Sequence, residues 1–227
     1  MRIDRPKSLT QLVVEELRTR IIEGRLALGA PLSENVLAAE LGMSKTPVRE
    51  ALLQLRSEGL IDVLPQRGSY VFRISTLDVG AISELRRILE MAAAELAVVR
   101  NGPALAARMQ DLLTRMGPAL ERDDRLTYHR LDGEFHEAIV ALAGNVFLAE
   151  AYGQIAFRIQ ALRSRLSSHA DLNRSSLEDH GAMLALVEAG DGAGLAAVLA
   201  RHVAATEQAY LKLLETRNLL EEGPDGA

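Results

Sequence analysis

The residues best suited to chemistry in this chain are one aspartate and three histidines in its C-terminal part. Asp132 and His136 are four positions apart, a spacing that puts a carboxylate and an imidazole on the same face of a helix. Two later helical segments contribute His180 and His202. One oxygen and three nitrogen donors inside a helical bundle suit zinc, with nickel or manganese as alternatives, and leave positions for water or a small ligand. The pattern predicts a divalent metal site.

Two other interpretations of these residues stay open. The first is that they are unrelated core or surface side chains, although the remaining histidines, His129 and His169, fall outside the pattern. The second is a metal-dependent enzyme, in which an open metal site activates water. That role needs a general base, and Glu134 is only two residues from Asp132, so it is expected to point away from the shared face. No nucleophile motif or phosphate-binding loop accompanies the set, so we do not expect an enzyme.

Helices are expected to position these ligands, because apolar residues after Leu77 recur at helical spacing and no strand pattern remains. The pattern predicts six segments, near residues 77–100, 102–121, 124–143, 145–168, 173–189 and 192–218. Short connections marked by glycine favour antiparallel neighbours. The predicted fold of residues 76–220 is therefore an all-α antiparallel bundle of six, or possibly seven, helices, followed by a flexible tail over residues 221–227.

The first 75 residues have a different organisation, which ends in a hairpin. The predicted elements are helices over residues 9–23 and 32–41, a helix from Lys45, and strands over residues 60–64 and 69–72. Ser33 opens the second helix, and the hydroxyl of Ser44 is expected to cap the third. Three helices and a hairpin with a basic tip predict a winged helix-turn-helix. In this architecture the third helix enters the major groove of DNA, and the wing reaches the backbone or the minor groove.

The third helix carries a basic edge beside its apolar face. Lys45, Arg49 and Arg56 fall within an arc of about 40° when each residue turns the helix by about 100°. Taken alone, such a helix fits a solvated basic edge as well as a DNA contact. The preceding helices and the hairpin favour DNA, because together they complete a DNA-binding architecture.

Composition limits the class of protein. A chain of 227 residues with 48% hydrophobic residues can bury a core and most plausibly forms two domains. The absence of cysteine excludes disulfides, and without a signal peptide or a membrane-spanning run we expect a cytoplasmic protein. The net charge is −5, but residues 1–75 hold eleven Lys and Arg against nine Asp and Glu. Because this local excess is small, DNA affinity is expected to depend on a few placed cations and on dimerisation.

Several short motifs in the first 75 residues occur in a specific order and spacing: residues 22–26, 29–34, 37–38, 44–52, 58–60 and 67–68. They resemble the GntR family of bacterial transcription regulators. The resemblance implies operator contacts from Ser33, Glu34, Ser44, Lys45, Thr46, Arg49, Arg56, Arg67 and Gly68. Lys45 stands where arginine is usual, and Asn35 where some relatives carry an arginine that reaches a base. Lysine cannot reproduce the bidentate contact of arginine with guanine. The operator sequence of family members therefore cannot be transferred to this chain.

The second half of the chain carries a further set of motifs: residues 132–136, Asn145, residues 176–180, residues 190–191 and His202. Over roughly residues 77–214 they resemble the FCD ligand-binding domain of the FadR-type branch of the same family. In metal-binding members an aspartate and three histidines hold the ion, and they correspond to the four ligands proposed above. The branch that senses fatty acyl-CoA lacks this set. Six expected segments resemble the shorter, VanR-type version of the domain.

The same resemblance implies a small organic acid as the effector. Arg86 matches a family arginine on the first helix of the domain, and Asn145 and Arg158 are further candidates to bind the acid. A guanidinium beside a metal ion is a suitable partner for a carboxylate. The simpler roles for these residues are surface ion pairing and helix capping.

The residues and the resemblances together predict a ligand-responsive bacterial transcription regulator. It is expected to act as a repressor, to bind operator DNA as a homodimer, and to sense a small organic acid at the divalent metal site. The alternative is a metal-dependent enzyme with an appended DNA-binding domain.

Overall fold

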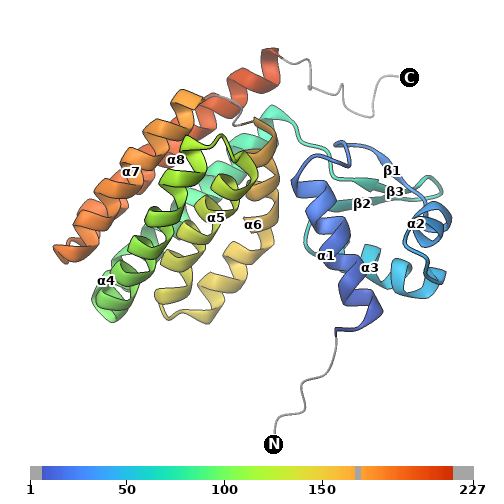
Figure 1. Ribbon diagram of the computed structural model, residues 1–227, viewed down its shortest axis with the longest axis horizontal. Helices are drawn as coiled ribbons and strands as arrows, with labels where there is room; N and C mark the ends of the chain where they lie inside the picture. Colours follow the sequence, from blue (N-terminus) through green and yellow to red (C-terminus); the bar gives the residue numbers. More distant parts are fainter. Residues whose placement is uncertain (1–6, 167–169, 217–227) are drawn as a thin grey trace, which may run out of the picture. The chain divides into compact units, whose positions relative to one another are not determined.

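The computed structural model describes residues 7–166 and 170–216, and the chain divides into two compact units, Met1–Arg73 and Ile74–Ala227. Figure 1 shows a small sheet with short helices in the first unit and long helices in the second. The division falls two residues before the boundary predicted at residue 75. None of the helices in these described ranges combines the length and the apolar character that crossing a membrane requires.

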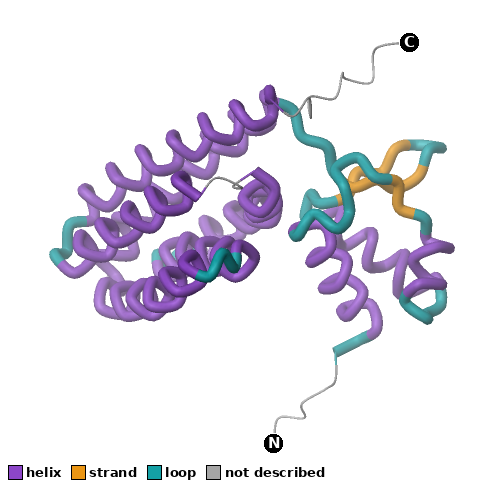
Figure 2. Tube along the Cα trace, turned by 45° about the horizontal axis from the view of Figure 1, so that its top comes forward, coloured by secondary structure: helices purple, strands orange, loops and turns teal. Residues whose placement is uncertain are grey.

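The first unit contains three helices and a three-stranded antiparallel sheet, as Figure 2 shows. The elements are α1 (Leu9–Ile22), β1 (Pro31–Leu32), α2 (Glu34–Glu40), α3 (Lys45–Ser57), β2 (Ile61–Leu64) and β3 (Gly68–Val71). The strand order is β1-β3-β2, so the two strands of the predicted hairpin are neighbours. Buried side chains at helical spacing on α1, such as Leu17 and Ile21, and on α3, such as Val48 and Leu55, form the core of the unit.

The predicted winged helix-turn-helix is confirmed, with one strand that the sequence pattern missed. In the hairpin Leu64 pairs with Gly68, and both Gln66 and Gly68 have positive φ, which turns the chain tightly at the tip. The missed strand is β1, where Pro31 pairs with Tyr70 on the outer edge of β3. A strand of two residues is too short to show an alternating pattern, and its second residue, Leu32, was placed at the start of the second helix.

The cap of α3 differs from the prediction. Ser44 is the N-cap residue, but its side chain makes no capping hydrogen bond. The hydroxyls of Ser8 and Ser33 do cap α1 and α2, and each accepts from the backbone N–H of the third helical residue. In α3 that third residue is Pro47, which has no backbone N–H to donate.

The second unit is helical throughout its described residues. Its helices are α4 (Thr76–Glu121), α5 (Arg125–Leu142), α6 (Val146–Leu166), α7 (Ala170–Glu188) and α8 (Gly192–Thr216). A capping box between Ser75 and Asp78 starts α4. The helix is interrupted at Asn101, where φ is −143° and ψ is 30°, so it consists of two segments, as predicted. The predicted tail over residues 221–227 lies outside the described residues.

The break in α4 has a local cause. Pro103 follows two residues after Asn101 and cannot donate to the preceding turn of the helix. At the break, the side-chain amide of Asn101 donates to the carbonyl of Leu142 at 2.7 Å, and Arg100 donates to the carbonyl of Ala143 at 2.7 Å. These bonds satisfy carbonyls at the C-terminal end of α5 and tie it to α4.

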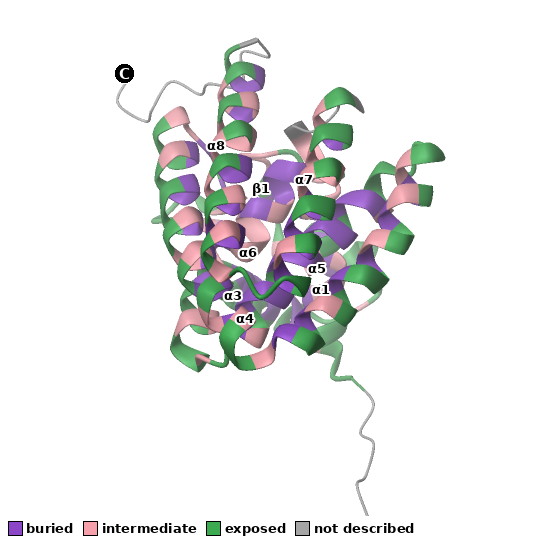
Figure 3. Ribbon diagram, turned by 90° about the vertical axis from the view of Figure 1, so that its left-hand side faces the viewer, coloured by how far each residue is buried: buried purple, intermediate pink, exposed green. Residues whose placement is uncertain are grey.

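The helices of the second unit pack with α4 against α5, α7 and α8. Figure 3 shows buried residues on the helix faces that are turned toward one another. Most of this core is apolar, but it also contains several ionisable side chains: Arg86, Glu90, Asp132, His136, Arg163, His180 and His202. Buried ionisable groups are costly unless they are paired or bind a ligand, so this cluster is the candidate site of the unit.

Candidate metal centre and DNA-binding surface

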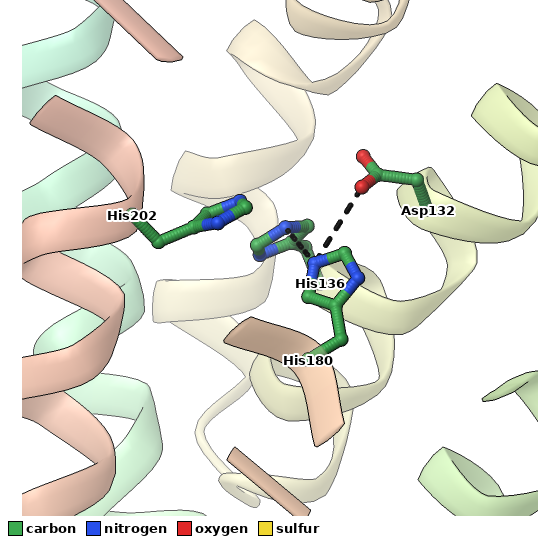
Figure 4. A group of neighbouring side chains, drawn as sticks. All are labelled: Asp132, His136, His180 and His202. Atoms are coloured by element: carbon green, nitrogen blue, oxygen red, sulfur yellow. Dashed lines mark hydrogen bonds and ion pairs between the residues drawn. The ribbon is translucent and has the colours of Figure 1, made fainter. Parts of the chain in front are cut away.

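Three helices bring the four predicted metal ligands together. Asp132 and His136 lie one turn apart on α5, His180 comes from α7, and His202 comes from α8. Figure 4 shows the four side chains pointing toward a common centre. All four are buried, and each offers a ligand atom within 4.8 Å of the ligand atoms of the other three.

The closest approaches in the group involve His180. Its Nε2 lies 3.3 Å from Nε2 of His136 and 3.5 Å from Oδ1 of Asp132. The ring of His202 is 5.2 Å from that of His136 and 5.0 Å from that of His180, measured between ring centres. Nδ1 of His180 is buried and has no hydrogen-bond partner among the described residues. A buried nitrogen without a protein partner is a feature of sites that a bound ion or water completes.

The electrostatic state of the group suits a divalent metal ion. Burial lowers the pKa of His136 to about 4, and burial also lowers the pKa of His180 well below its usual value. Burial raises the pKa of Asp132, but Arg163 and the neighbouring histidines outweigh this effect and hold that pKa below its usual value. At neutral pH the site therefore offers imidazole lone pairs and a carboxylate, which is the donor set of zinc and related ions.

A buried network on α4 and α6 surrounds His136. Glu90 accepts from Nδ1 of His136 at 2.8 Å through Oε2, and from Nε of Arg86 and the Tyr152 hydroxyl at 2.7 and 3.0 Å through Oε1. Arg86 also donates through Nη2 to Nε2 of His136 at 3.0 Å. Burial raises the pKa of Glu90, but the charge of Arg86 and the hydrogen bonds from His136 and Arg86 outweigh it and lower the pKa. Glu90 therefore stays ionised, and its attraction to Arg86 offsets the cost of burying both charges in the core.

Two further charged residues complete the surroundings. Nε of Arg163 on α6 lies 2.6 Å from Oδ2 of Asp132, and Oδ2 of Asp179 on α7 lies 3.3 Å from Nδ1 of His202. Glu90, Arg163 and Asp179 were not predicted as part of the site. A signal existed for Glu90, which is four residues after Arg86, and for Asp179, which precedes a ligand. No local pattern marks Arg163.

A small open pocket adjoins the candidate metal centre, and its empty space of about 290 Å³ includes open solvent. Its walls include Asp132 and His202 from the centre, together with Arg163. The remaining lining is largely polar and comes from Tyr128, His129, Leu172, Asn173, Ser176, Thr206 and Tyr210. A small polar ligand in this pocket would therefore lie beside both a guanidinium and the metal ligands.

The predicted effector residues are not gathered in this pocket. Arg86 is buried against His136, whereas Asn145 accepts from the backbone N–H of Leu148 at 3.3 Å in the first turn of α6. Arg158 is half-buried on α6. None of the three is among the residues that line the pocket, and Arg163 is the arginine that the structure places there. Their role in effector binding stays a prediction.

The predicted DNA contacts lie on the exposed surface of the first unit. Lys45, Arg49 and Arg56 are exposed on α3, and Arg67 and Gly68 are exposed at the hairpin. Arg49 does not stand alone, because Nη2 and Nε form hydrogen bonds of 2.9 and 3.2 Å with the carboxylate of Glu34. Ser33, Glu34, Ser44 and Thr46 lie at the starts of α2 and α3. The arrangement presents cations and helix N-termini, both of which bind phosphate.

Comparison with protein families assigns both halves of the chain. Residues 9–71 match the model of the bacterial regulatory proteins of the gntR family, and residues 81–205 match the model of the FCD domain. The second match alone covers more than half of the chain and includes all four candidate metal ligands.

Similar proteins include characterised and uncharacterised regulators. McbR of Escherichia coli is 32% identical over 89% of this chain and 95% of its own. The solved structure of E. coli McbR/YncC, at 30% identity, covers 94% of this chain and 100% of that chain with a TM-score of 0.78. The "Probable D-xylose utilization operon transcriptional repressor" of Paenarthrobacter nicotinovorans is 32% identical over 82% of this chain and 81% of its own. A Streptomyces ambofaciens regulator is 37% identical, but the match spans only 54% of that protein. The chain therefore belongs to the gntR family of bacterial transcription regulators, in the branch that carries an FCD domain.

Proposed function

We propose that this regulator is a repressor that binds operator DNA as a homodimer and senses a small organic acid at a divalent metal site. The observation that carries the proposal is the buried group of Asp132, His136, His180 and His202 within the FCD domain. Families and relatives point to transcription regulation rather than to catalysis. The enzyme alternative is therefore not pursued.

The metal is proposed from the donor set of the four side chains, with zinc first and nickel or manganese as alternatives. Asp132, His136, His180 and His202 would hold the ion. When bound, it would add positive charge at the wall of the pocket and attract a carboxylate. Arg163 lines the same pocket and is a second group that pairs well with a carboxylate. Hydroxyl and amide groups on the remaining wall provide hydrogen bonds for the rest of a small acid.

Dimerisation is proposed from the exposed apolar face of α4. Leu77, Leu85 and Ile88 are 83%, 40% and 58% exposed and fall within an arc of about 80° of the helix. Glu84 and Arg87, which carry opposite charges, lie along one side of this arc. A two-fold interface uses the same patch on both copies, so a patch that carries both charges is complementary to itself. A second copy of this chain is therefore the proposed occupant of the face.

Regulation then requires a difference in effector affinity between two arrangements of the dimer. The acid must bind the arrangement that releases DNA more tightly than the arrangement that holds it. The first unit carries few net positive charges, so the two copies must contact the operator together for useful affinity.

Selection of genomic DNA fragments by the purified zinc-loaded protein tests the proposal. We expect enrichment of a palindromic site, with a footprint of two half-sites, and release of the fragment by a subset of small carboxylic acids. Enrichment of sites without two-fold symmetry, or acid sensitivity that persists after metal removal, would contradict the homodimer or the metal-centred effector site, respectively.

A further inference from the structure

Two of the three candidate histidine ligands have a carboxylate beside Nδ1. Nδ1 of His136 lies 2.8 Å from Oε2 of Glu90, and Nδ1 of His202 lies 3.3 Å from Oδ2 of Asp179. In both pairs the carboxylate comes from a different helix than the histidine: Glu90 from α4 and Asp179 from α7. The same kind of contact therefore occurs twice, between two different pairs of helices.

The contacts determine which ring nitrogen carries the proton. An ionised carboxylate only accepts hydrogen bonds, so Nδ1 of each neutral imidazole must donate and the lone pair is left on Nε2. A second contact supports this assignment for His136, because Arg86 has no acceptor and its Nη2 lies 3.0 Å from Nε2. This contact uses the same lone pair, so Arg86 must give it up when a metal binds Nε2. Nε2 of His136 also lies 3.3 Å from Nε2 of His180, on the side of the ligand group.

We propose that Glu90 and Asp179 are positioning residues that commit Nε2 of His136 and His202 to the metal. The proposal rests on the proposed metal site. Carboxylates behind metal-binding histidines fix the ring orientation and the tautomer, and their loss commonly weakens metal binding about 10–100-fold. Glu90 is itself held in place by Arg86 and Tyr152.

The two positions differ in how easily they can be tested. The Glu90 side chain is fully buried in a charged network, whereas the Asp179 side chain is 26% exposed and, besides its contact with His202, forms a distant ion pair, 3.9 Å long, with Arg201. Removal of the Asp179 carboxylate therefore leaves the core packing intact. The neighbouring Glu178 is exposed on the same helix and provides a matched control, since it carries the same charge.

Zinc affinity of the full-length protein, measured by competition with a chromophoric chelator, is the first test. We expect Asp179→Ala to weaken zinc binding about 10–100-fold, and Glu178→Ala to leave it nearly unchanged. Glu90→Gln, which keeps the shape of the side chain, should weaken zinc binding as well, and Tyr152→Phe gives a milder variant if that protein does not fold. Equal affinities for wild type and Asp179→Ala, or equal losses for Asp179→Ala and Glu178→Ala, would overturn the positioning role.

The histidine tautomers of the metal-free protein give a second test, by long-range proton–nitrogen NMR. We expect His202 to carry its proton on Nδ1 in wild type and in Glu178→Ala, and to populate both tautomers in Asp179→Ala. A proton on Nε2 in wild type would reject the inference. If wild-type protein takes up no zinc but shows the expected tautomers, then the proposed metal site is wrong. The proposed orientation of His202 by Asp179 is retained in that case.

Discussion

Glu34 at the start of α2 holds the guanidinium of Arg49 on α3, with Nη2 of Arg49 2.9 Å from Oε2 and Nε 3.2 Å from both carboxylate oxygens. The pair is exposed, and it occupies the face of Arg49 that a guanine or a phosphate would use. The operator contact that we predict for Arg49 would therefore require it to leave or share Glu34, so the pair would limit the access of DNA to this arginine.

Arg49→Ala is expected to weaken specific operator binding about tenfold or more for each half-site, because a bidentate base contact is lost. Fluorescence anisotropy with a selected operator duplex measures the change. Arg25→Ala removes an arginine that is also exposed in the first unit and should leave the affinity nearly unchanged. Unchanged operator affinity in Arg49→Ala would reject the assigned DNA-binding face.

Glu34→Gln is expected to have the opposite effect on non-specific DNA. Removal of the carboxylate releases Arg49 and takes a negative charge away from the phosphates, so affinity for a scrambled duplex should rise severalfold. The ratio of operator to scrambled affinity should fall. Glu40→Gln, on the same helix and paired with Arg20, is the matched control. All titrations must be run at one salt concentration.

Much of the fold can be predicted from the sequence, because its elements are marked locally. The start of α3 at Lys45 follows from Ser44 and Pro47, and the six helical segments follow from apolar spacing and glycine breaks. The two-residue strand β1 was missed, because its pairing with β3 depends on residues nearly forty positions away. The capping role of Ser44 was wrong, because Pro47 lacks the donor.

Only the site residues that follow a recognisable pattern in the sequence could be predicted. Asp132 and His136 share a helical face, and the scarcity of histidine drew attention to His180 and His202. The groups that surround them have no such pattern. Glu90 contacts His136 across 46 positions, and Arg163 reaches Asp132 from another helix, so only the packing of the bundle reveals them.

Elemental analysis of purified protein should find close to one divalent ion per chain. The double variant His180→Ala, His202→Ala is expected to lose it, since it removes two of four donors. His129→Ala removes a buried histidine outside the group and should retain the metal. Wild-type protein that stays metal-free after supplementation with zinc, nickel and manganese would contradict the proposed centre.

Thermal denaturation with a panel of carboxylic acids tests the effector site. Lactate, succinate, citrate, gluconate and benzoate are suitable probes, and an acid that binds the folded state should raise the midpoint as its concentration rises. We expect the stabilisation to require the metal and to be reduced in Arg163→Gln, because that guanidinium lines the pocket. Equal stabilisation of metal-free protein would exclude direct contact between acid and metal.

Ile88→Glu is expected to convert the dimer to a monomer, because it places a charge in the centre of the apolar face of α4. Light scattering after size exclusion measures the molar mass. Leu126→Glu changes an exposed apolar residue of α5, outside this face of α4, and should have a smaller effect. A dimer that persists in Ile88→Glu would place the interface elsewhere.

The capping box at Ser75 fixes the N-terminal end of α4, so this helix can transmit movement along its length. From Thr76 to Arg100 the helix is unbroken, and its third and fourth turns carry Arg86 and Glu90, which hold His136. Ten residues of helix, about 15 Å, separate Thr76 from Arg86. A ligand-induced shift of His136 would reach Arg86 and Glu90 directly, and this continuous helix would pass it toward Ser75, two residues after the end of the first unit. Through α4, the candidate metal site is thus linked by an unbroken run of hydrogen-bonded turns to the segment that leads into the first unit.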